Sequence, residues 1–181
     1  MTAIPTIESE RLILRPWREA DIDGYAAIYV DAERSQFIGG PLSREDAWRK
    51  MATVIGHWSL RGYGTWALEE KASRRFVGYC GPWNPMGWPE PEIGWGLLAD
   101  VEGSGFATEA ALRARAYAYE TLGWSTAISV IRTDNTPSIR VAERLGCTRE
   151  STAEYKGQAR FIYRHPPSSK LQASSKTQAG A

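Results

Sequence analysis

Glu92-Ile-Gly-Trp-Gly-Leu-Leu-Ala99 runs directly into Asp100-Val-Glu-Gly103-Ser-Gly105-Phe-Ala107, the most informative segment of the chain. Its first half is typical of a strand, the glycines of its second half indicate a loop, and small residues at helical spacing then continue to Leu122. Glycines let successive backbone N–H groups turn toward one point, and a helix N-terminus adds partial positive charge there. The unit therefore predicts an anion site, although a tight strand-to-helix connection uses the same residues.

The rest of the chain supplies elements on both sides of this unit. Periodicity predicts strands over 11–15, 65–69, 75–81, 92–99, 126–131 and 160–164, and helices over 20–30, 43–60, 107–122 and 136–145. The three short strands between the second and third helices suggest an antiparallel meander. We therefore expect an α/β (α+β) fold with a mixed central sheet and helices on its faces.

Composition and charge argue against several classes of protein. The chain has 181 residues with 22 Lys+Arg and 21 Asp+Glu, a net charge of +1, so neither a nucleic-acid nor a membrane partner is expected. No apolar run is long enough for a membrane span, and the N-terminus lacks a secretory signal, which makes a cytoplasmic location the expectation. Cys80 and Cys147 read as core residues, and no metal site is expected. We expect one domain over 8–165 and a disordered tail over 166–181.

Two classes of ligand use such a glycine loop. A dinucleotide would match Gly103-x-Gly105-x-x-Thr108, with Asp134 near the end of the next strand as the ribose ligand. Thr108 replaces the third glycine, however, and the unit lies in mid-chain with too few residues after it to complete a doubly wound sheet. A nicotinamide-dependent enzyme is therefore kept only as an alternative.

Acyl-coenzyme A is the second class, and here the chain resembles the GNAT superfamily of N-acetyltransferases, specifically its ribosomal-protein (Rim-type) branch. The resemblance covers about residues 8–164. Glu10-Arg-Leu-Ile-Leu-Arg-Pro-Trp17 is similar to the first strand of that branch, and Glu92-Ile-Gly-Trp95 with Gly103-Ser-Gly-Phe-Ala-Thr-Glu-Ala110 is similar to its fourth strand and pyrophosphate loop. Asn135-Thr-Pro-Ser138 continues the match. Glu102 departs from the pattern, because many members have Gln or Arg there.

The resemblance implies a GNAT-like, mostly antiparallel sheet, acetyl-CoA as cosubstrate, and no metal. The residues implied to bind acetyl-CoA are Gly103, Ser104, Gly105, Phe106, Ala107 and Thr108 at the pyrophosphate, Leu97 and Leu98 at the thioester, and Asn135 and Ser138 beside the pantetheine arm. That arm would lie along the 92–99 strand, whose edge opens toward 126–131. The implied acceptor is a primary amine, either a protein N-terminus or a small molecule, and the protein would be a monomer or homodimer.

Two residues are candidates for the chemistry of transfer. A primary amine has a pKa of ~8 to ~10.4, so near neutral pH a base must remove its proton. Glu92 is our candidate base, acting through a water, while the alternative is that it only begins a strand; Glu69 and Glu70 are substitutes. Many relatives have a Tyr seven residues after the Asn of this motif, where this chain has Ala142. Ser138 is then the available hydroxyl near the implied sulfur, unless it only caps a helix together with Asn135.

A proline-rich connection is the last unusual feature. Residues 81–91 join two neighbouring strands with four prolines and three large apolar side chains, Trp83, Met86 and Trp88. Such a loop would form a wall over the amine site, a dimer contact, or a cover for its own core. His57 and His165 lack partners at metal or triad spacing. A noncatalytic acyl-CoA-binding module remains a third hypothesis beside the two enzymes.

Overall fold

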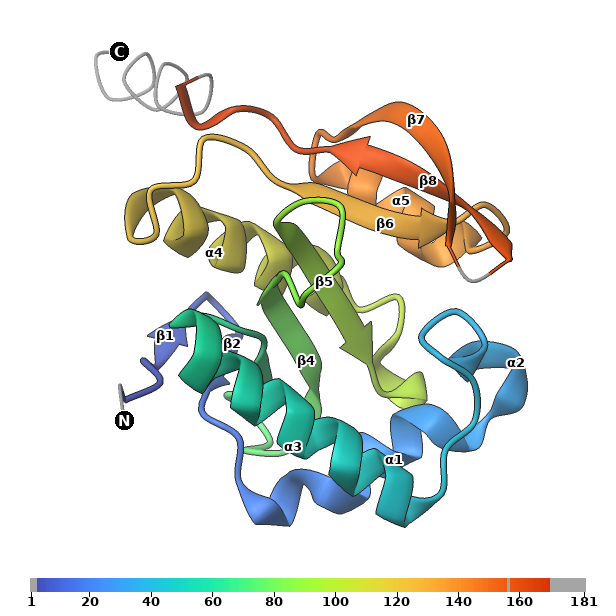
Figure 1. The fold of residues 1–181 in the computed structure, drawn as a ribbon. Helices are drawn as coiled ribbons and strands as arrows, with labels where there is room; N and C mark the ends of the chain where they lie inside the picture. The colour runs from blue at the N-terminus through green and yellow to red at the C-terminus, as the bar shows by residue number, and fades with distance from the viewer. Residues whose placement is uncertain (1–2, 156, 170–181) are drawn as a thin grey trace.

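A computed structural model describes residues 3–155 and 157–169. Their strands form one sheet in the order β1-β2-β3-β4-β5-β6-β8-β7 (Figure 1). The strands are β1 (Ile7–Glu8), β2 (Leu12–Arg15), β3 (Trp66–Glu70), β4 (Phe76–Trp83), β5 (Glu92–Leu97), β6 (Ile128–Arg132), β7 (Thr148–Tyr155) and β8 (Gln158–Arg164). Within the described chain only β5 and β6 pair in parallel, so the mixed, mostly antiparallel sheet is confirmed. The doubly wound parallel sheet that a dinucleotide-binding unit needs is not formed by these residues.

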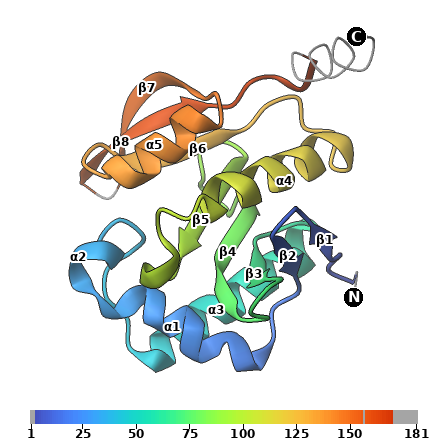
Figure 2. The same cartoon turned by 180° about the vertical axis from the view of Figure 1, so that it is seen from behind.

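Helices cover the two faces of this sheet. They are α1 (Ile22–Val30), α2 (Ala32–Ser35), α3 (Arg44–Arg61), α4 (Phe106–Glu120) and α5 (Thr136–Arg144), with short 3-10 turns η1 (Glu19–Asp21) and η2 (Ala99–Val101). Figure 2 shows α4 and α5 on one face of the sheet, and α1 lies with α3 on the other side (Figure 1). The alanine face of α4 is buried against the sheet in one hydrophobic cluster, while α1 and α3 enclose a second. Small side chains allow α4 to approach the strands closely.

Helix ends follow the sequence signals closely. The Ser43 hydroxyl accepts the Asp46 N–H at 3.1 Å and caps α3, and Pro137 stands in the first turn of α5. The predicted helix over 20–30 begins instead with the 3-10 turn η1, because the Asp21 carboxylate binds Arg15 and the Arg18 N–H rather than capping α1. No helix of the described chain has the length and apolar character to span a membrane.

Three elements are absent from the sequence prediction: β1, α2 and β7. β7 is the edge strand, and seven of its eight residues are exposed, so it lacks the in-out alternation that reveals a half-buried strand. The beginning of the predicted disordered tail also differs. Tyr119 Oη donates to the Pro166 carbonyl at 2.8 Å, and the Ser168 N–H donates to the Ser125 carbonyl at 2.9 Å, so both residues are held by the domain. Residues 170–181 of that tail lie outside the described residues.

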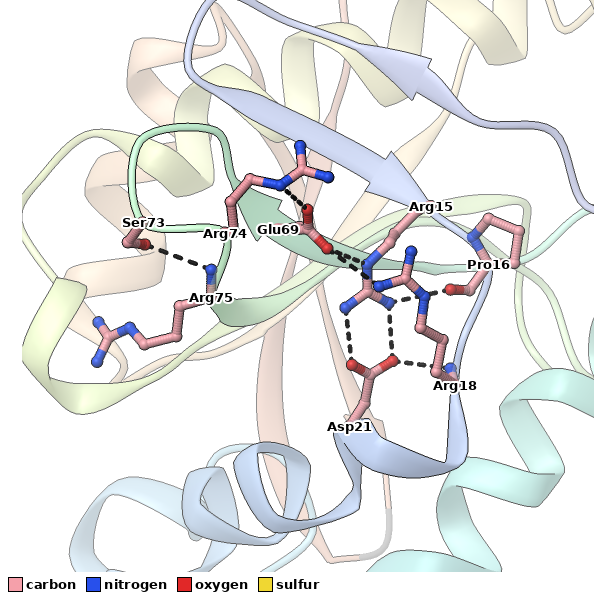
Figure 3. A network of polar contacts seen from close by, with 8 residues as sticks. All are labelled: Arg15, Pro16, Arg18, Asp21, Glu69, Ser73, Arg74 and Arg75. Atoms are coloured by element: carbon pink, nitrogen blue, oxygen red, sulfur yellow. Dashed lines mark hydrogen bonds and ion pairs between the residues drawn. The ribbon is translucent and has the colours of Figure 1, made fainter.

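A buried ionic network ties β2 to β3 and η1 (Figure 3). The Glu69 carboxylate, 3% exposed, accepts Arg15 Nε at 2.7 Å and also contacts Arg18 and Arg74. The two terminal nitrogens of Arg15 reach the Asp21 carboxylate at 2.7 and 2.8 Å. Each buried charge therefore has an opposite charge at hydrogen-bond distance, which offsets the cost of removing it from water. Glu69 is engaged in this network, which makes it a poor substitute for the base.

Removal of the Glu69 charge is expected to destabilise the fold. Glu69→Gln leaves the buried Arg15 guanidinium with one carboxylate instead of two, and breaking a buried ion pair on one side commonly costs about 3 kcal/mol. Urea unfolding at pH 7 measures the loss. Glu70→Gln, one residue along the same strand and less deeply buried, is the matched control, with an expected change within about 0.5 kcal/mol. Equal losses in the two variants would contradict the role of the network.

Candidate functional site

The strands β5 and β6 part almost as soon as they meet. Their only register pair is Glu92 with Ile128, and the Ile128 N–H donates to the Pro91 carbonyl at 3.0 Å. Beyond this point the two arrows in Figure 1 diverge. Ser129 Oγ donates to the Ile93 carbonyl at 2.7 Å, a side-chain bond where a continuous sheet would have backbone pairing. The strand edges are therefore open toward the space between them, as the sequence resemblance implied.

A cavity of about 570 Å³ opens where the strands part. Its walls come from β5, β6 and β8, from α1 and α3, from the start of α5, and from the connection between β4 and β5. Trp83, Trp88 and Trp95 make much of the wall aromatic. Pro85 to Trp88 of the proline-rich connection contribute directly, so this loop covers the cavity. A mostly apolar pocket with a few polar groups is the usual form of a small-molecule site.

Glu92 stands in the wall of this cavity at the point where the strands separate. Its side chain accepts two hydrogen bonds, one to Oε1 from the Val130 N–H at 3.0 Å and one to Oε2 from Trp88 Nε1 at 2.7 Å. Burial raises the pKa of Glu92 to about 7, against the two hydrogen bonds and the positive charge of Arg160, which lower it. The carboxyl group therefore exchanges its proton near neutral pH, as a general base must.

A second buried group supports the strand junction without reacting. His165 Nε2 lies 3.0 Å from Ser129 Oγ, and since that hydroxyl donates to Ile93, the imidazole is the donor. Arg115 Nη1 donates to the Leu145 carbonyl at 2.7 Å and lies 3.4 Å from His165 Nδ1. Burial, together with the positive charges of Arg115 and Arg164, lowers the pKa of His165 to about 3. His165 is thus a neutral link between α4, β6 and β8.

His57 has a similar structural role at the loop that covers the cavity. The Asn84 N–H donates to its Nε2 at 3.1 Å, so the ring proton is on Nδ1, which donates to the Tyr63 carbonyl at 2.7 Å. The ring also stacks on Trp83 with centroids 4.4 Å apart. Burial lowers the pKa of His57, which keeps the imidazole neutral. Within the described residues no group of three or more His, Cys, Asp or Glu side chains could hold a metal ion.

The glycine loop begins immediately after η2. Gly103 and Gly105 have φ of 79° and 87°, a conformation that glycine adopts at low cost, and Gly105 is the N-cap of α4. Gly105 has no side chain with which to cap the helix, and the neighbouring Ser104 Oγ accepts the Phe106 N–H at a long 3.4 Å. Thr108 Oγ1, in the first turn, is buried and has no hydrogen-bond partner among the described residues. A helix N-terminus behind a glycine loop and a buried hydroxyl without a partner fit the anion site that the sequence predicts.

Three arginines from other elements hold this loop in place. Arg11 donates to the Ser104 carbonyl at 3.0 Å and pairs with Glu109 at 2.7 Å. Arg34 of α2 pairs with Glu102, the residue that departs from the family pattern, and Arg75 pairs with Asp100. The Glu102 carboxylate therefore connects this loop to α2, and the charge of Arg34 compensates the charge of Glu102.

The other predicted site residues divide into two groups. Asn135 and Ser138 line the cavity, and Asn135 Oδ1 accepts the Ser138 N–H at 3.2 Å, so Asn135 also caps α5. Leu97 and Leu98 do not line it, and the Leu98 N–H already donates to the Val77 carbonyl at 3.0 Å. The stretch of β5 at the cavity is residues 92–95 instead. β5 thus has the cavity along its first half and the glycine loop after its end.

Sequence reasoning missed three partners of Glu92: Trp88, Val130 and Arg160. Trp88 was expected in the loop over the site, but its hydrogen bond to Glu92 was not. Val130 acts through its backbone N–H, which no residue type reveals, and Arg160 reaches the cavity from β8, a pairing that only the fold establishes.

Comparisons with known proteins agree with this geometry. Residues 11–148 match the family model described as Acetyltransferase (GNAT) domain. An acetyltransferase from Agrobacterium tumefaciens str. C58 superposes with a TM-score of 0.82 and 32% identity, covering 92% of this chain and 96% of that one. The uncharacterized N-acetyltransferase YoaA of Bacillus subtilis (strain 168) is 25% identical over 150 residues, which cover 81% of this chain and 84% of that protein. RimJ of Mycobacterium smegmatis, solved in complex with CoA-disulfide, shares the fold, with a TM-score of 0.72, 17% identity and coverage of 92% and 89%.

The raised pKa of Glu92 predicts a pH-dependent stability. The Glu92 carboxyl has a pKa of about 7 in the folded protein, against ~4.3 for a Glu in the unfolded chain. The native state therefore holds the proton more tightly than the unfolded state, and this adds to the free energy of unfolding. The contribution is complete below pH ~4 and is lost as pH rises through 7. Glu92→Gln removes the titration. The unfolding free energy of the parent, measured relative to the variant, should therefore fall by roughly 2 kcal/mol between pH 5 and pH 8. A difference that stays constant with pH would mean that Glu92 titrates normally.

Proposed function

We propose, since the chain belongs to the acetyltransferase (GNAT) domain family, that it transfers the acetyl group of acetyl-CoA to a primary amine with Glu92 as general base. Acyl-CoA-dependent acetyl transfer is the reaction of this family, and its fold binds CoA. The amine acceptor and the residue roles are our proposal. The observation that carries it is one buried carboxyl group with a pKa of about 7, in the wall of a cavity where β5 and β6 part.

The proposed chemistry follows from the position of Glu92. Acetyl-CoA, when bound, supplies the thioester carbonyl that the amine attacks. The attacking amine must first lose a proton, and Glu92 takes it, directly or through one water. Trp88 Nε1 and the Val130 N–H hold the carboxylate in one orientation, so that it does not need to reorganise when the proton arrives. Residues 85–88 line this cavity beside Glu92.

The glycine loop is the proposed phosphate site. The backbone N–H groups of residues 103–108 and the positive end of α4 would bind the pyrophosphate of coenzyme A. Support comes from the helix N-terminus behind the glycine loop and from Thr108 Oγ1, which lacks a partner among the described residues. β5 leads from this loop back to the cavity, so the pantetheine arm would follow the strand.

Ser138 is proposed to assist the departing sulfur. It lines the cavity at the first turn of α5, and its hydroxyl makes no hydrogen bond to any described residue. The position where many relatives have a tyrosine is Ala142, which is fully buried. Since a serine hydroxyl is too weak an acid to be an efficient proton donor, we assign Ser138 to hydrogen bonding or to placement of a water. Asn135 would combine capping with contact to the pantetheine arm.

A protein N-terminus as acceptor, as in the Rim-type branch, is the narrower version of the proposal. The similarity to RimJ at 17% identity concerns the fold alone, and the Agrobacterium tumefaciens structure at 32% identity is named only as an acetyltransferase.

The phosphate site predicts a selective effect of one glycine. Gly105→Ala places a methyl group 3.3 Å from the Arg11 guanidinium and strains a residue with φ of 87°, next to the proposed pyrophosphate position. Calorimetric titration should show coenzyme A binding at least about 10-fold weaker. Gly123→Ala, at φ of 71° beyond the other end of α4, imposes the same backbone strain in open space and should leave binding unchanged. Equal affinity in both variants would mean that the phosphate site lies elsewhere, and binding of NAD in place of coenzyme A would revive the dinucleotide hypothesis.

Glu92→Gln is expected to separate binding from chemistry. A panel of primary amines assayed for release of free thiol from acetyl-CoA first identifies an acceptor. With that acceptor, the variant should lose ~10²- to 10⁴-fold in kcat at neutral pH, while acetyl-CoA affinity is unchanged. The loss should shrink as pH rises toward the pKa of the amine, because more acceptor is then already deprotonated. The rate of the parent should fall as pH decreases below about 7, where Glu92 takes up a proton.

Ser138→Ala is the contrasting variant, with a milder loss that does not recover at high pH because it affects the leaving sulfur. Full activity of Glu92→Gln at neutral pH would remove Glu92 from the mechanism. No thiol release by the parent with any amine, despite tight binding of coenzyme A, would favour the noncatalytic acyl-CoA-binding module.

A further inference from the structure

Arg160 places a partly buried guanidinium in the wall of the cavity, and no ion pair joins it to a carboxylate of the described residues. Its Nε is buried and makes no hydrogen bond to any described residue. Nη2 reaches Gln158 Oε1 at 3.4 Å, a long contact, and the guanidinium lies 5.5 Å from the centre of the Tyr155 ring. A buried guanidinium nitrogen without a partner is costly, so its persistence needs an explanation.

The neighbouring strand makes the position of Arg160 more costly still. Arg160 pairs across the ladder with Arg132 of β6, and like charges directly opposite each other destabilise a sheet. Arg132 is compensated by both oxygens of Asp134. Burial and the charge of Arg132 lower the pKa of Arg160, while the charges of Glu92 and Asp134 act in the opposite direction. Arg160 thus stands beside a like charge, with its Nε unbonded to any described group.

The rest of the cavity wall is complementary to a molecule with two opposite charges. Glu92 is the one acidic residue in the described wall, and it interacts electrostatically with Arg160. Lys50 and Arg132 are the other charged residues there. This balance disfavours a polyamine, whose several positive charges would meet more cations than anions. It favours an acceptor whose amine faces Glu92 and whose anionic group faces Arg160.

We propose that Arg160 is the specificity-determining residue of the acceptor site and binds a carboxylate, so that the acceptor is a primary amine of the amino-acid type. The inference rests on the proposed function for the identity of the reacting group. A guanidinium presents its N–H groups in a planar fork that matches a carboxylate, and Nε is still available for such a pair. The aromatic wall fits an apolar or aromatic side chain, since Trp83, Trp88 and Trp95 surround the remaining space.

The experiment compares ligands that differ only in the carboxylate. L-phenylalanine, L-phenylalaninamide and 2-phenylethylamine, with the corresponding leucine series, are titrated against the protein with coenzyme A bound, and binding is followed by tryptophan fluorescence. Thiol release from acetyl-CoA is measured in parallel. Each ligand is compared between the parent and Arg160→Gln, so that differences in amine pKa between the ligands cancel. Arg160→Lys tests charge without the planar fork. Arg149→Gln is the control, because its guanidinium lies over the Phe161 ring on the other face of β8.

Arg160→Gln should raise the Kd and KM of the free amino acids about 10- to 100-fold, while those of the amides and amines change less than about 3-fold. Arg160→Lys should recover part of the loss, and Arg149→Gln should have no effect. A peptide arm with Phe-Glu-amide and Phe-Gln-amide identifies the source of the carboxylate: a preference for the former would assign it to an acidic side chain of a peptide.

Equal loss for all ligands, or failure of every carboxylate-bearing ligand to bind the parent, would overturn the proposal. Arg160-dependent binding without thiol release would overturn the transfer reaction and leave the carboxylate site standing.

Discussion

A single backbone pairing, Glu92 with Ile128, joins β5 to β6, and the site depends on the parting of the strands after it. Continued parallel pairing would use the Val130 N–H in the ladder. That N–H instead donates to the Glu92 carboxylate, which is thereby held at the apex of the opening. The same divergence exposes the first half of β5 to the cavity and leads its second half to the glycine loop. One departure from sheet regularity thus creates both the cavity and the position of Glu92 in its wall, on which the proposed function rests.

Most buried polar side chains of the described residues have hydrogen-bond partners, and a few do not. Arg15, Asp21, Glu69, Ser129 and His165 are buried and all have partners, so they hold strands together without requiring a ligand. Four buried side-chain atoms of the described residues have none, on Ser35, Thr65, Thr108 and Arg160. Thr65 and Arg160 line the cavity, and Thr108 lies in the first turn of α4. A buried polar atom without a hydrogen-bond partner costs stability. Three of these four atoms lie at the proposed ligand sites, where a bound ligand would supply the partner.

The sequence predicts most of the framework because its signals are local. Capping by Ser43, the small-residue face of α4 and the glycines before it each depend on a few adjacent residues. Glu92 and Ser138 could be singled out by resemblance, and both line the cavity. The partners of Glu92 could not be predicted in the same way. Val130 contributes only its backbone N–H, which no residue type reveals. Arg160 lies on β8, and its neighbour β7 lacks the alternation of buried and exposed residues that would predict a strand. Both contacts therefore depend on long-range strand pairing. The thioester contact expected at Leu97 and Leu98 stays a prediction, and the Leu98 N–H is already bonded to the Val77 carbonyl of β4.

The connection between β4 and β5 links the surroundings of Glu92 to the wall of the cavity. It is held at three points: Asn84 on His57, Trp88 against Tyr155, and Glu90 on Arg164. Trp88 Nε1 donates to the Glu92 carboxylate, which lowers the pKa of that group, while burial raises it. Trp88 also lines the cavity. A change at Trp88 that enlarges the cavity would therefore also remove a hydrogen bond from Glu92, so the proposed acceptor site and the proposed base cannot be altered independently at this position.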